Sequence, residues 1–137
     1  MNPTNPTNPT TRFLYYWLPV IVWCAVIFAQ SAFSTPDLVP DVPNIDKFLH
    51  AGVYGLLGFL LARAFGAIPG WSGKSLRLIA SATIFTALYG LSDEWHQSFV
   101  AARTAEAADL MADLVGGFIG GLAYVSTALL SKKQQMR

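Results

Sequence analysis

Four long apolar segments limit this chain to very few folds. They occupy residues 13–33, 48–66, about 76–100 and about 110–130. A helix needs roughly 20 apolar residues to cross the hydrocarbon core of a bilayer, and a helix satisfies all its backbone hydrogen bonds within one segment. Hydrophobic residues make up 53% of the chain and charged residues only 12%, against roughly 25% charge in soluble domains. The sequence therefore predicts an all-α polytopic membrane protein, a bundle of four transmembrane helices.

The 137 residues are enough for one domain, which we expect to span residues 12–131. Residues 1–11 repeat Asn-Pro-Thr, and proline at every third position prevents helix and sheet, so this segment is predicted to be a disordered tail. Residues 132–137 are predicted to form a short basic tail. Arg12, the apolar stretch after it and the small-residue sequence AQSA at residues 29–32 could also be a signal peptide with a cleavage site. Its apolar run of seventeen residues is long for that role, so we keep four helices.

The basic residues indicate an orientation. Four spans place both termini on one side, together with the connection around residues 64–76. That side carries seven of the nine basic residues, which are Arg12, Arg63, Lys74, Arg77, Lys132, Lys133 and Arg137. The positive-inside rule places this side in the cytoplasm. We therefore expect a multi-pass protein of the bacterial inner membrane with cytoplasmic N and C termini. The net charge of +1 gives no basic field that would attract nucleic acid.

The acidic residues are segregated at the opposite, outer end. All eight lie there with both histidines: Asp37, Asp41, Asp46, Asp93, Glu94, Glu106, Asp109 and Asp113. Acidic residues contribute little to topology, so their position needs another cause. Residues 78–91 form an uncharged run of fourteen, which rises only about 21 Å as a helix, less than the roughly 30 Å of a bilayer core. Charged groups at such depth usually face a bundle interior or a wet cavity, which predicts an outward-facing polar pocket.

Helical spacing predicts which side chains line this pocket. Residues three or four positions apart share a helix face. The second, third and fourth segments present such faces, with Asp46, Lys47, His50 and Tyr54 on the second, Tyr89, Asp93, Glu94, His96 and Gln97 on the third, and Asp109 and Asp113 on the fourth. Arg103 lies in the connection between the third and fourth segments.

Two stretches, DKFLHAGVYGLLGFLL and LSDEWHQSFVAARTAEAADLMADLVGGFIGG, resemble the VanZ-like family of small bacterial membrane proteins, and the similarity covers roughly residues 14–125. The family motif consists of Asp-Lys-x-x-His-x-x-x-Tyr, Asp-Glu-x-His-Gln, an arginine and a spaced aspartate. Its positions here are Asp46, Lys47, His50, Tyr54, Asp93, Glu94, His96, Gln97, Arg103 and Asp109.

The family name comes from a protein linked to resistance against the glycopeptide teicoplanin. The resemblance therefore implies an envelope-related membrane protein with a link to glycopeptide resistance, and it implies no settled reaction. The chain departs from the family at two places. Ala101 and Ala102 stand where many members have a Pro-Gly-like turn, and Asp113 stands where many have asparagine.

Our main hypothesis is recognition of an anionic envelope lipid or cell-wall precursor, with acid–base chemistry on its phosphate or carboxylate as the favoured version. The histidines titrate nearest neutral pH, and carboxylates can orient them. Arginine and lysine are suited to hold the anion. We assign catalysis to Asp46, His50, Asp93, Glu94 and His96, and substrate binding to Lys47, Tyr54, Tyr89, Gln97, Arg103, Asp109 and Asp113.

Several alternatives stay open. The pocket could bind the lipid or precursor without converting it, or the polar groups could only hold the helices together. No cofactor is firmly assigned. Zinc or manganese on His50, His96, Asp46 and Asp93 is a weaker hypothesis, because the sequence lacks His-Glu-x-x-His. A proton-coupled transporter is weaker still, because no acid or histidine lies near the middle of a span.

Membrane lipids are the expected partners. A second copy of the chain is also considered, because the fourth segment has two overlapping small-residue motifs, Gly116-x-x-x-Gly120 and Gly117-x-x-x-Gly121.

Overall fold

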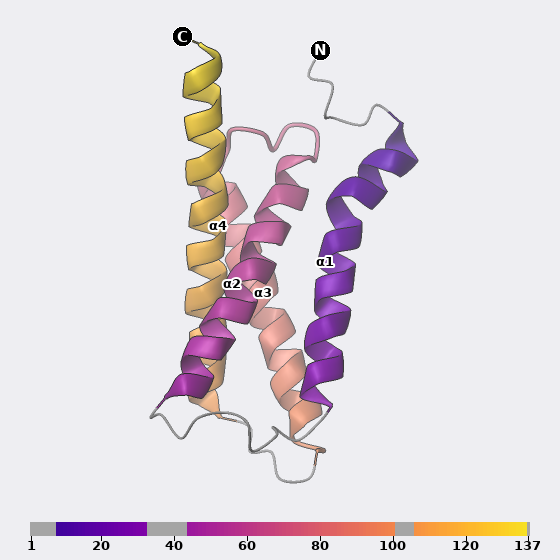
Figure 1. Cartoon of the computed structure of the whole chain (residues 1–137), viewed down its shortest axis with the longest axis vertical. Helices are drawn as coiled ribbons and strands as arrows, with labels where there is room; N and C mark the ends of the chain where they lie inside the picture. Colours follow the sequence, from indigo (N-terminus) through magenta and orange to yellow (C-terminus); the bar gives the residue numbers. More distant parts are fainter. Residues whose placement is uncertain (1–7, 33–43, 101–105, 137) are drawn as a thin grey trace.

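A computed structural model describes residues 8–32, 44–100 and 106–136. Its helices are α1 (Pro9–Ser31), α2 (Ile45–Gly66), α3 (Ser75–Gln97) and α4 (Ala107–Gln135), and these described ranges contain no strand. Each helix is long and apolar enough to cross a membrane. Successive helices run in opposite directions, so the start of α1 and the end of α4 lie at one end of the bundle (Figure 1). The predicted all-α, four-helix membrane architecture is confirmed.

The helix ends differ from the expected ones by a few residues. Helix α1 begins inside the segment predicted as a tail, because the Asn8 side chain accepts a hydrogen bond from the Thr10 N–H at 2.9 Å and Pro9 occupies the first helical position. Residues 1–7 lie outside the described ranges. Helix α4 continues through Lys132 and Lys133 in its last turn. Positively charged side chains near the C-terminus stabilise a helix, because they interact favourably with the helix dipole. The segment predicted as a basic tail is therefore helical to Gln135.

Helices α2 and α4 form the most extensive contact in the bundle, because both present glycines where they cross. A Cβ added at Gly58 would collide with the backbone of Gly117, and one added at Gly120 would collide with the carbonyl of Gly55. The backbones therefore approach closely, as small-residue motifs allow. Gly116, Gly117, Gly120 and Gly121 are buried within the chain, and the oligomer considered through glycine-rich helix faces stays a prediction.

Helix α3 packs on both α2 and α4, whereas α1 packs on α2 and α3. The buried apolar core includes Leu57, Leu61, Phe65 and Ala82. Large apolar side chains cover the outside of all four helices. An exposed apolar surface of that extent is unusual for a protein in water, and it matches a bundle surrounded by lipid.

Candidate functional site

The predicted site residues that the structure describes lie near one end of the bundle, where α1 and α3 finish and α2 and α4 begin (Figure 1). We call this the polar end. Six acidic side chains and one lysine lie there among the described residues, namely Asp46, Asp93, Glu94, Glu106, Asp109, Asp113 and Lys47. Arg103, predicted to bind substrate, lies outside the described residues. The contacts at the polar end form two connected groups.

The first group surrounds Lys47 at the start of α2. Its Nζ lies 2.5 Å from Asp46 Oδ2, 2.7 Å from Glu106 Oε2 and 2.9 Å from Asp109 Oδ1. The lysine side chain is 22% exposed and Asp109 only 10%. Glu106 and Asp109 belong to the start of α4, so the lysine ties α2 to α4. The predicted anion-binding role of Lys47 would require it to leave one of these carboxylates.

His50 lies one turn further into the bundle and pairs with Asp113. Its Nδ1 is 2.9 Å from Asp113 Oδ1, and Asp113 is fully buried. The other Asp113 oxygen, Oδ2, has no hydrogen-bond partner among the described residues. The His50 ring lies parallel to the Tyr54 ring, with centroids 6.0 Å apart. We count His50 and Asp113 with the first group, and the contact between the His50 and Tyr54 rings connects it to the second group.

The second group is centred on Asp93 of α3. Its Oδ2 accepts hydrogen bonds from Ser31 Oγ at 2.7 Å, Gln97 Nε2 at 3.0 Å and the Tyr54 hydroxyl at 3.1 Å. All four residues are buried, and they come from α1, α2 and α3. The second oxygen, Asp93 Oδ1, is buried and has no partner among the described residues. Asp93 therefore holds three helices together and keeps one acceptor free.

Glu94 follows Asp93 but faces α4. Its Oε2 accepts a hydrogen bond from the backbone N–H of Glu106 at 3.0 Å, and its Oε1 is buried without a partner among the described residues. One ligand atom each from Glu94, His50 and Asp109 lie within 4.8 Å of one another. The four residues considered as metal ligands from the sequence do not form such a cluster, and only His50 belongs to this one.

His96 lies apart from His50, on the side of α3 that faces α1. Its ring stacks on Phe28 with centroids 4.3 Å apart, and its Nδ1 has no partner among the described residues. Here α1 and α3 border a pocket of about 280 Å³, which Phe28, Tyr89, Ser92, Asp93, Trp95, His96 and Phe99 line. The pocket therefore combines apolar walls with one carboxylate and one imidazole. Tyr89 was predicted to bind substrate, but its hydroxyl donates to the Cys24 carbonyl at 2.6 Å.

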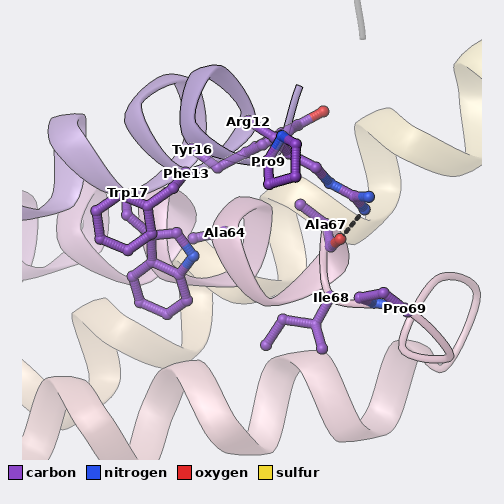
Figure 2. A pocket seen from close by; sticks show the side chains of 9 residues that line it. All are labelled: Pro9, Arg12, Phe13, Tyr16, Trp17, Ala64, Ala67, Ile68 and Pro69. Carbon is purple, nitrogen blue, oxygen red and sulfur yellow. Dashed lines mark hydrogen bonds between the residues drawn. The ribbon is translucent and has the colours of Figure 1, made fainter. Parts of the chain in front are cut away.

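A second pocket lies at the opposite end of the bundle (Figure 2). Residues of α1 line it together with Ala64 of α2 and the residues that follow that helix. The Arg12 guanidinium donates a hydrogen bond to the Ala67 carbonyl across its rim. Among the described residues its lining contains no acidic residue and no histidine, so this pocket offers neither a carboxylate nor an imidazole to a ligand.

Three residues of the polar end were not singled out from the sequence as site residues. Ser31 falls in the AQSA segment, and its buried hydrogen bond to Asp93 connects α1 to the site. Glu106 precedes the first turn of α4 and contacts both Lys47 and Glu94. Phe28 lies three residues before Ser31 and packs on His96. A small polar residue at the end of an apolar run was the available signal for Ser31.

Comparison with known proteins gives one match. A family model described as VanZ/LLP1 matches residues 7–130. No curated protein and no solved structure matches the chain. The matched range contains every residue of the two polar groups.

Proposed function

Because this chain belongs to the VanZ/LLP1 family, we propose that its polar end recognises the head group of an anionic envelope lipid or lipid-linked cell-wall precursor. The observation that carries the proposal is a set of buried polar atoms that have no partner among the described residues: Asp93 Oδ1, Glu94 Oε1, His96 Nδ1 and Asp113 Oδ2. Leaving such groups unpaired costs about 1–3 kcal/mol each. A cluster selected only for helix packing would have paired them.

The pocket between α1 and α3 suits an amphiphilic ligand. Phe28, Trp95 and Phe99 offer apolar surface to a lipid chain, while Asp93 and His96 offer an acceptor and an imidazole to the head group. An acyl or prenyl chain gains free energy from such surface. A carboxylate accepts hydrogen bonds from hydroxyl, amide or amine groups of the ligand, whereas a phosphate needs positive charge nearby.

We assign that positive charge to Arg103. Arginine binds phosphate with two parallel hydrogen bonds, and the sequence places Arg103 between α3 and α4. In the acid–base version, His96 transfers a proton to or from the bound head group, because it is the histidine on the pocket wall. In the binding version, the same contacts hold the ligand unchanged, for example by shielding a cell-wall precursor from a glycopeptide such as teicoplanin.

The competing function is purely structural. It is favoured by the three carboxylates on Lys47 and the three donors on Asp93, which link all four helices. Interhelical polar contacts of this kind contribute about 0.6 kcal/mol on average in membranes. The structural function accounts for these pairs and leaves the unpaired buried atoms without a role.

The proposal is tested by identifying the lipids that copurify with the protein. Wild type, His96→Ala and the control Lys132→Gln, at the opposite end of the bundle, are purified from bacterial membranes in mild detergent. Their lipids are then extracted and identified by mass spectrometry. We expect one anionic lipid or precursor to be enriched over the membrane extract in wild type and Lys132→Gln, and to be lost in His96→Ala. Equal lipid profiles in all three proteins would contradict lipid recognition and support the structural function.

Binding and conversion are separated in a second step. The enriched lipid is incubated with each protein in detergent, and its mass is followed over time. A mass change with wild type that is absent with His96→Ala supports the acid–base version. An unchanged lipid supports the binding version.

A further inference from the structure

We infer that His50, Glu94 and Asp109 form a binding site for one divalent metal ion of the zinc or manganese type. The three residues belong to α2, α3 and α4, and one ligand atom from each lies within 4.8 Å of the other two. One imidazole nitrogen and two carboxylate oxygens suit Zn²⁺ and Mn²⁺, whose remaining positions water or substrate can fill.

Glu94 provides the observation that points to a ligand. Glu94 is only 6% exposed. Its Oε2 accepts a hydrogen bond from the Glu106 N–H, whereas its Oε1 has no partner in the described ranges. A buried carboxylate without compensation is costly, and buried charges are usually paired or bound to metal. A metal ion within reach of His50 and Asp109 would provide that compensation.

His50 has a carboxylate partner of the kind that metal-binding histidines usually have. Asp113 holds its Nδ1 at 2.9 Å, which leaves Nε2 as the ring nitrogen available to an ion. Histidines that bind metal almost always give their other ring nitrogen to a carboxylate, a carbonyl or water, which fixes the tautomer and the ring orientation. The full burial of Asp113 keeps this contact out of solvent.

The acidic group around Lys47 provides an internal comparison. Asp46, Glu106 and Asp109 are also close enough together to hold an ion, but the ammonium of Lys47 lies within 2.9 Å of all three. That group therefore has its cation. Asp109 belongs to both groups. Lys47 forms no ion pair with Glu94 in the described part of the chain, so Glu94 is the buried carboxylate that this lysine does not compensate.

This metal site is tested apart from the proposed lipid recognition, because the experiment uses the metal alone. Protein stripped with chelator in detergent is titrated with Zn²⁺ or Mn²⁺ by calorimetry, and bound metal is counted by mass spectrometry after desalting. We expect one ion per wild-type chain and none in Glu94→Gln. The matched control Glu106→Gln, the same change at the partly exposed neighbour, should keep one ion. Asp113→Asn should weaken binding by about 10- to 100-fold.

Two results would overturn the site. One is a wild-type chain that binds neither metal, and the other is a Glu94→Gln variant that binds as wild type does. If the variants fail to fold, the site can still be tested on the wild-type protein alone. Pulsed electron paramagnetic resonance of the Mn²⁺-loaded protein should detect one directly coordinated imidazole nitrogen, and its absence contradicts coordination by His50.

Discussion

Ser31 and Asp93 are 62 positions apart in the sequence, yet their side chains share a buried hydrogen bond of 2.7 Å. The bond joins the last residue of α1 to the last turns of α3. Other hydrogen bonds connect α1 to the bundle nearer its middle, among them Trp23 Nε1 to the Val53 carbonyl at 3.0 Å and the Tyr89 hydroxyl to the Cys24 carbonyl at 2.6 Å. Ser31 therefore fixes α1 beside the pocket that Phe28 and His96 border.

This relationship predicts unequal stability losses within the polar end. Ser31→Ala removes one of the three donors on Asp93 and should cost about 0.6 kcal/mol, the average for interhelical polar contacts in membranes. Asp93→Ala should cost more, because it removes the acceptor that three buried donors share, and among the described residues the Tyr54 hydroxyl has no other acceptor. His96→Ala should cost less than Asp93→Ala, because among the described residues its Nδ1 has no hydrogen-bond partner and the change removes mainly the stacking on Phe28. Thermal unfolding in detergent measures all three.

A different outcome would change the interpretation of the site. Equal losses in Asp93→Ala and His96→Ala would indicate that His96 also holds the bundle together, as the structural function requires. A His96→Ala protein at least as stable as wild type would fit a functional residue, because active sites are commonly kept at some cost to stability.

The crossing of α2 and α4 predicts opposite effects for two glycines on one helix. Gly58→Ala should destabilise the protein by about 1–3 kcal/mol, the usual cost of overpacking, because its Cβ would collide with the backbone of Gly117. Gly52→Ala is the matched control, since nothing lies within 4 Å of its Cβ, and alanine favours a helix by up to about 1 kcal/mol. Unfolding in mixed detergent micelles compares the two. Equal stability would show that α2 and α4 do not cross as closely as described.

The basic residues predict that both termini face the cytoplasm. In a Cys24→Ser background, which removes the single native cysteine, one new cysteine is placed at either end of the bundle. A membrane-impermeant maleimide should label Ala108→Cys in intact cells. Ser72→Cys, in the connection between α2 and α3, should be labelled only after the cells are permeabilised. Both positions are exposed, so burial does not confound the result, and the reverse pattern would invert the proposed topology.

Much of the fold was predictable from the sequence. An uncharged run such as residues 78–91 has to satisfy its backbone internally in lipid, so helix type and number follow from composition and length. The ends were less predictable, because they depend on local contacts such as the Asn8 cap that starts α1 at Pro9. Spacing by three and four also identified the faces of single helices, including the one that carries His50 and Tyr54.

The tertiary structure alone decided which polar residues meet. Helical periodicity leaves open how far a helix is rotated against its neighbours, and here glycine contacts such as Gly58 on Gly117 set the approach of α2 and α4. That approach gives Lys47 three carboxylates and pairs His50 with Asp113. His96, grouped with His50 by sequence reasoning, instead stacks on Phe28. The sequence by itself determined four spans and the segregation of acids, because lipid constrains each helix separately. The pairing of charges depended on helix rotation and crossing, which only packing between helices determines.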